Sequence, residues 1–156
     1  MPIRDLAAAW DATKLIQYWR IVDGPASDDS MTSELQQLGD AVLDTLKSYN
    51  LCEIDDDGEK HMTKLDPTIL KEPSNIAHSA LYLLAACGAI RSSLIDHNFP
   101  EDSIIRDALD GLVAGILSMQ QTDGAFLPEF EASDNDVFRG IEFFPGEAMV
   151  ALMDVY

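Results

Sequence analysis

Basic residues are scarce in this sequence. Its 156 residues include 10 Lys and Arg against 28 Asp and Glu, which gives a formal net charge of −18. A charge of this sign repels phosphate backbones, so the composition argues against nucleic acid as a partner. We expect most of the acidic side chains to form a solvated surface.

Long apolar runs are missing as well. Although 47% of the residues are apolar, no uninterrupted run approaches the roughly 20 residues that a membrane-spanning helix needs. The first ten residues, MPIRDLAAAW, lack the apolar core of an export signal and are typical of the start of a helix. We therefore expect a cytoplasmic protein that does not contact a membrane.

Cysteine is rare, and its two copies do not have the spacing of metal ligands. Cys87 lies in the apolar run LLAACGAI, where a buried small side chain is favoured over a disulfide or a nucleophile. The acidic stretch DDDG at 55–58 invites comparison with a calcium loop, but Lys64 occupies the position where such a loop needs a bidentate Glu. We expect neither a metal nor a bound cofactor.

Apolar residues recur every three or four positions through most of the chain, which predicts an all-α protein. The third apolar segment, IAHSALYLLAACGAI, is apolar on nearly all sides and should be buried all round. Between 51 and 65 the period changes, and LCEI and KHMTKL flank an Asp-Gly turn, which predicts one small β-hairpin. The predicted helices cover 3–21, 31–49, 74–96, 101–120 and 145–156.

The ends of these helices are predicted from their capping residues. Ser30 or Thr32 can cap the second helix and Ser74 can cap the third. Asn50 tolerates the left-handed conformation that ends a helix, so we place the end of the second helix there.

The connections between the predicted helices alternate in length. Those at 22–30 and 97–100 are short, whereas those at 50–73 and 121–144 are long. Successive antiparallel helices place their connections at alternate ends, so both long connections should lie at one end, where binding sites commonly occur. The third and fifth helices, which start from that end, are the most apolar and are expected to be inner neighbours. The second and fourth should pack outside them.

Two stretches resemble the repeats of helical toroids. The stretch GLVAGILSMQQTDGAF at 111–126 resembles the turn in which an outer helix ends in Gln, a polar linker and Asp-Gly before an aromatic, as in terpene cyclases and protein prenyltransferase subunits. The stretch FFPGEAMVAL at 143–152 resembles the junction between loop and inner helix in six-hairpin toroids, which include many carbohydrate-active enzymes. The positions that match the first pattern are Gly111, Leu117, Gln120 or Gln121, Asp123, Gly124 and Phe126.

The chain departs from the cyclase pattern. It has Phe126 where Trp is commonest, no second copy of the repeat, and no Asp-rich catalytic motif. These differences weigh against isoprenoid chemistry and leave the carbohydrate-active type as the nearer resemblance.

The residues of the turn also have a purely structural reading. Gly124 can take the positive φ that reverses the chain, and Asp123 can accept hydrogen bonds from nearby backbone amides. Gln120 can satisfy carbonyls at the end of the helix, and Phe126 can fold back as an apolar plug. We therefore interpret the turn as structural, in preference to a catalytic Asp123.

The candidate catalytic residues are Glu147 and His78. Both lie in the first turn of a predicted inner helix, and sugar chemistry uses two carboxyls, or a carboxyl with a His, to give and take a proton. Each has a structural alternative, because Glu147 can complement the helix dipole and His78 can be a hydrogen-bonded core residue.

Aromatic rings suited to stacking on a sugar are Tyr82, Phe138, Phe143 and Phe144. The candidate substrate-binding residues are Asn75, Arg139, Glu142, Phe143 and Phe144.

The sequence as a whole predicts one domain over 1–156, built of antiparallel helical hairpins that form an arc of an α/α toroid. The resemblance implies a carbohydrate-processing or carbohydrate-binding protein of glycosidase, lyase or epimerase type, with a saccharide or another small molecule as its substrate. The alternatives are an isoprenoid cyclase or prenyltransferase-like toroid and a helical binding module without catalysis. Five helices cannot close a ring, so we expect the N-terminal part of a longer toroid. Its edge helices, including a flank of the third, should expose apolar surface and allow self-association.

Overall fold

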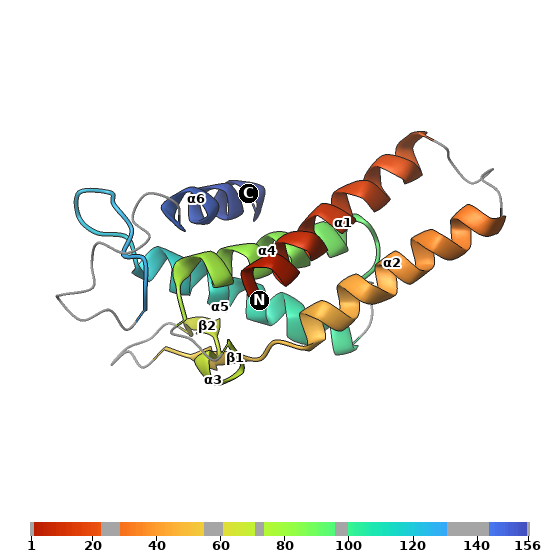
Figure 1. Ribbon diagram of the computed structural model, residues 1–156. Helices are drawn as coiled ribbons and strands as arrows, with labels where there is room; N and C mark the ends of the chain where they lie inside the picture. Colours follow the sequence, from red (N-terminus) through yellow and green to blue (C-terminus); the bar gives the residue numbers. More distant parts are fainter. Residues whose placement is uncertain are drawn as a thin grey trace.

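The computed structural model describes residues 2–22, 29–54, 61–70, 74–95, 100–130 and 144–155. Within these residues the chain is mostly helical, with six helices and one antiparallel sheet of two strands (Figure 1). None of the described helices combines the length and the apolar character needed to cross a membrane. The elements in chain order are α1 (Pro2–Val22), α2 (Asp29–Lys47), β1 (Leu51–Glu53), β2 (Thr63–Leu65), α3 (Pro67–Leu70), α4 (Ile76–Arg91), α5 (Pro100–Ser118) and α6 (Phe144–Val155).

Helix α4 is the centre of the fold. Every residue from Ile76 to Ala89 is buried, because α1, α2, α5, α6 and β2 all pack against this helix. The prediction of a helix buried all round is therefore confirmed. The accompanying expectation of an exposed flank on this helix is wrong, since α1 and α6 cover it.

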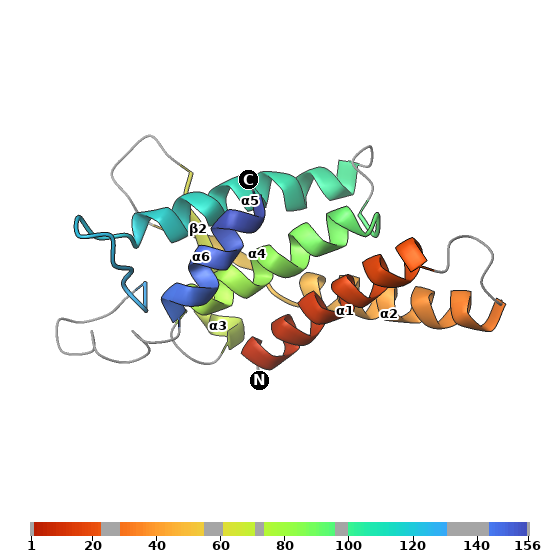
Figure 2. The same ribbon diagram turned by 90° about the horizontal axis from the view of Figure 1, so that it is seen from above.

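The helices run in two opposite directions. Figures 1 and 2 show α1, α4 and α6 running one way and α2 and α5 running back. The connections that leave α2 and α5 therefore start at the end of the molecule where α4 and α6 begin, as the alternation of short and long connections predicted. Helices α4 and α6 are neighbours, and α5 packs against α4 and the strand β2.

The small sheet confirms the predicted β-hairpin. Leu51, Cys52 and Glu53 of β1 pair with Leu65, Lys64 and Thr63 of β2 in antiparallel register. All three residues of β2 are buried, whereas β1 is partly exposed. The burial of β2 follows from its place against α5 and α4. The acidic turn at 55–58 lies outside the described residues.

Two glycines permit the closest contacts of this core. A Cβ atom added at Gly88 in α4 would lie 2.1 Å from Thr13 Oγ1 of α1. A Cβ atom added at Gly115 in α5 would lie 2.2 Å from the carbonyl oxygen of Thr63 in β2. Both distances are far below van der Waals contact. Only glycine at these positions therefore allows α1 to lie so close to α4, and β2 so close to α5.

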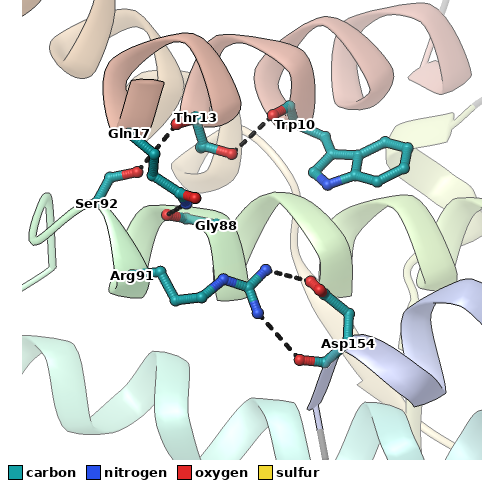
Figure 3. A network of polar contacts seen from close by, with 7 residues as sticks. All are labelled: Trp10, Thr13, Gln17, Gly88, Arg91, Ser92 and Asp154. Atoms are coloured by element: carbon teal, nitrogen blue, oxygen red, sulfur yellow. Dashed lines mark hydrogen bonds and ion pairs between the residues drawn. The ribbon is translucent and has the colours of Figure 1, made fainter. Parts of the chain in front are cut away.

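A polar network joins α1, α4 and α6 near the C-terminal end of α4 (Figure 3). Gln17 donates to the carbonyl of Gly88 at 3.2 Å, and the Ser92 hydroxyl donates to the carbonyl of Thr13 at 3.1 Å. Arg91 forms an ion pair with Asp154 of α6 and donates to its carbonyl at 3.0 Å. The Gly88 carbonyl also accepts the Ser92 amide at 2.9 Å, so these side chains add hydrogen bonds between neighbouring helices to those of the backbone.

Three predicted helix ends are wrong. Helix α2 begins at Asp29, so Ser30 and Thr32 lie inside the helix and not at the position before its first residue. It ends at Lys47, before Asn50, because the Asn50 carbonyl accepts the Asp66 amide at 3.0 Å and extends the hairpin. Helix α4 is capped by Asn75 and not by Ser74.

The far end of α4 also differs from the prediction. The helix stops at Arg91 instead of continuing to 96, because Ser93 adopts a left-handed φ of 50°. This turn lets the Leu94 amide donate to the Ala89 carbonyl at 2.9 Å, which closes the helix end.

The turn after α5 confirms the structural interpretation of TDGAF. Gly124 has a φ of 89°, and an Asp123 carboxylate oxygen accepts the Ala125 amide at 2.9 Å. Phe126 is 7% exposed and folds back to pair with Gln120 in a β-bridge. The Gln120 side chain donates to the Gly124 carbonyl at 3.4 Å. It therefore stabilises the turn, whereas the sequence had suggested that it would satisfy carbonyls at the end of the helix.

Gly124→Ala should lower the free energy of unfolding by about 1 kcal/mol, because a left-handed φ is unfavourable for any residue with a Cβ. No heavy atom lies within 4 Å of the added Cβ, so the loss would come from the backbone conformation alone. Gly146→Ala is the matched control: its Cβ also meets nothing within 4 Å, but it is helical, and alanine should be neutral or stabilising by about 0.5 kcal/mol. Urea unfolding measures both, and equal effects at the two positions would contradict the prediction.

Candidate functional site

The two long connections meet at the start of α4. Asn75 and Glu129 form an isolated antiparallel bridge. The Ile76 amide donates to the Pro128 carbonyl at 2.9 Å, and the Phe130 amide donates to the Ser74 carbonyl at 3.2 Å. We call this contact between residues 74–76 and 127–130 the junction. It is held by backbone hydrogen bonds, so it is a fixed part of the fold.

Asn75 and His78, both candidate site residues, form a capping box at the start of α4. The Asn75 side chain accepts the His78 amide at 3.0 Å, and His78 Nδ1 accepts the Asn75 amide at 3.3 Å. This arrangement pairs donors that a helix start leaves without intrahelical partners. His78 is completely buried. Its geometry is that of the hydrogen-bonded core histidine that the sequence left open as an alternative.

Glu147 lies in the first turn of α6 and is half-buried. Its Oε2 atom is buried and has no hydrogen-bond partner within the described part of the chain. Buried side-chain oxygens in folded proteins are nearly always hydrogen-bonded. The amide groups at the start of α6 favour a negative charge there, which explains a carboxylate at this position but leaves the buried oxygen to be accounted for.

The other candidate binding residues are only partly covered by the described structure. Arg139, Glu142 and Phe143, like the aromatic Phe138, lie outside the described residues. Phe144 is the first residue of α6, which begins one residue earlier than the predicted Pro145.

Tyr82 is not available for stacking on a ligand. It is 5% exposed because α4 is covered on all sides, and burial raises the pKa of its phenol. The expectation that it contributes an aromatic surface to a site is therefore wrong.

Lys64, which entered above only as a mismatch to a calcium loop, is buried near the junction. It is 7% exposed, and its ammonium group lies 5.8 Å from the centre of the Phe130 ring, next to the junction. A lysine in a short hairpin is usually exposed. Its burial depends on the packing of β2 and on the position of 127–130, both set by residues distant in the sequence. No local pattern could have indicated it.

Cys87 lacks the properties of a reactive thiol, and no metal centre is found among the described residues. Cys87 is 8% exposed, and burial raises the pKa of its thiol to about 11, so it is a poor nucleophile at neutral pH. Nowhere in the ranges that the structure describes do three His, Cys, Asp or Glu side chains gather as metal ligands.

The fold is thus that of a small, mostly helical protein with one two-stranded antiparallel sheet. Comparison with known proteins adds no family to this description: no protein-family model, no curated protein and no solved structure gives a significant match.

Proposed function

We propose that the chain is an arc of helical hairpins of the α/α-toroid type that binds a saccharide at the end formed by the starts of α4 and α6. The parallel course of α1, α4 and α6, with α2 and α5 running back, suits an inner and an outer layer of such an arc (Figure 2). The junction supports the location, because it holds both long connections against the first turn of α4.

The observation that carries the proposal is the carboxylate of Glu147. Its buried Oε2 atom has no partner among the described residues. A sugar hydroxyl is a suitable donor to such an oxygen, and the protonated acid can in turn give its proton to a glycosidic oxygen. Glu147 is accordingly the proposed acid or base, and Glu142, just before α6 in the sequence, is proposed to contact the substrate.

Asn75 and His78 have a supporting role in this proposal. Their capping box fixes the first turn of α4, and the backbone of Asn75 is bonded to the strand-like segment at Glu129. We assign to His78 the positioning of this turn, because its ring is buried and its Nδ1 is already engaged. Arg139, Phe143 and Phe144 are proposed to contact the substrate through charge and ring stacking.

A binding module without catalysis is the second candidate. It is favoured by the burial of Tyr82 and Phe126, which removes two described aromatic rings from any sugar-stacking surface. On this alternative the carboxylate of Glu147 accepts a ligand hydroxyl and transfers no proton.

Glu147→Gln tests both candidates. With cellotetraose, maltotetraose and chitotetraose as probes, calorimetry should detect binding of at least one, and Glu147→Gln should weaken it by about tenfold or more, because a hydrogen bond to a charged group is lost. Glu34→Gln, at an exposed position of α2, is the matched control and should bind as the unmodified protein does.

The remaining outcomes separate the candidates. Loss of both binding and hydrolysis in Glu147→Gln would support the enzyme, and binding without hydrolysis by the unmodified protein would support the module. Unchanged binding combined with a lower melting temperature in Glu147→Gln would reduce this residue to a partner of the helix dipole.

A further inference from the structure

The outward face of α6 is apolar. Met149, Val150 and Met153 are 56%, 46% and 77% exposed, and their spacing of one, three and four residues places them on one side of the helix. No charged residue interrupts this stripe. Apolar side chains that gather in this way on a surface commonly mark a site of interaction.

A hollow lies beside this stripe. Its volume is about 250 Å³, and it is formed between α6 and the turn after α5. The turn is held in shape by the hydrogen bonds around Gly124 and Asp123, so the wall on that side is fixed. On the other side, methionine side chains can adapt to different partners, because they are long, unbranched and polarisable. The residues that line the hollow are Gln120, Gly124, Phe126, Met149, Leu152 and Met153.

The charge next to the hollow is negative. Asp123, in the turn that forms one wall, is acidic and exposed, whereas Asp154 of α6 is paired with Arg91 of α4. The chain as a whole carries a formal charge of −18. A partner for this surface must combine an apolar face with positive charge.

We propose that the stripe and hollow on α6 bind a basic amphipathic helix of another protein. Such a helix would lay its apolar side chains along the methionines, and its lysines and arginines would be attracted by Asp123 and by the negative net charge of the chain. The same charge argues against a second copy of this chain as the occupant, since each copy carries −18. The proposed surface uses neither the junction nor the carboxylate of Glu147, so it does not depend on the proposed saccharide site.

The test uses a synthetic helical peptide of several turns, built from Leu on one face and Lys on the other. Fluorescence anisotropy should show that it binds the unmodified protein, and that the double variant Met149→Gln, Met153→Gln binds at least about tenfold more weakly. Both methionines are exposed, so the fold should tolerate the change. Ile21→Gln is the matched control, since Ile21 is an equally exposed apolar residue, at 83%, on the distant end of α1.

Two further peptides make the result specific. A peptide of the same composition with Leu and Lys in an order that removes the apolar face should bind at least about tenfold more weakly, as should one with Glu in place of Lys. Equal binding of the reordered peptide would overturn the proposal, because it would show charge attraction alone. An equal loss of binding in Ile21→Gln would also overturn it. Sedimentation would also overturn the proposal if it showed the unmodified protein to be a dimer and the double methionine variant to be a monomer. Helix α6 would then be a contact between two copies of this chain.

Discussion

Gly115→Ala should lower the free energy of unfolding by about 3 kcal/mol, at the upper end of what overpacking usually costs. The added Cβ would lie 2.2 Å from the carbonyl oxygen of Thr63 and 3.2 Å from Ile54 Cδ1. The closest atom belongs to the backbone of β2, which cannot rotate out of the way as a side chain can. Helix α5 and the hairpin must therefore separate.

Two other glycines provide the controls for this prediction. Gly146→Ala introduces a Cβ that meets nothing and should leave stability unchanged or slightly raised. At Gly88 the nearest atoms belong to the side chain of Thr13, so Gly88→Ala should be destabilising but partly rescued by Thr13→Ala. Urea unfolding measures the four single variants Gly115→Ala, Gly146→Ala, Gly88→Ala and Thr13→Ala, together with the double variant at 88 and 13. A cost at Gly115 no larger than that at Gly146 would show that β2 does not lie against α5 at this distance.

His78→Ala should also cost about 3 kcal/mol. The substitution removes a completely buried ring and leaves a cavity, and it deprives the Asn75 amide of its acceptor, Nδ1 of His78. Both effects fall on the first turn of α4, the helix against which most of the fold packs.

His78→Gln separates the two contributions. Glutamine is a common partner in capping boxes and can reach back to the Asn75 amide, so it should recover part of the stability that alanine loses. Thermal and urea unfolding measure the recovery. If glutamine and alanine were equally destabilising, the hydrogen bond of His78 to Asn75 would contribute nothing measurable.

The sequence was enough to predict which segments form helices, where the hairpin lies and in which direction the helices run, because these features follow from local patterns. The apolar character of 76–89 alone indicates burial on all sides, and the alternation of short and long connections indicates which ends lie together. The helix ends were less predictable. Ser74 and Asn75 are both good capping residues, and the choice between them depends on which one His78 reaches.

The turn at Gly124 was predictable for the same reason as the hairpin. Its φ, its Asp123 hydrogen bond and the return of Phe126 involve residues within a few positions of one another. The junction between Asn75 and Glu129 and the burial of Lys64 depend on contacts between distant segments. A single sequence contains no local signal for either, so the surroundings of the proposed site could be known only from the structure.

The proposed saccharide site at the start of α4 and α6 can be tested most directly by mapping amide resonances during a titration with the three tetrasaccharides. We predict that one of them shifts the amides at 75–78, of Leu127, Glu129 and Phe130, and at 146–148, and that these shifts are lost in Glu147→Gln and kept in Glu34→Gln. Shifts confined to the opposite end, around Ser92 to Ile95, or shifts that persist unchanged in Glu147→Gln, would contradict the proposed site.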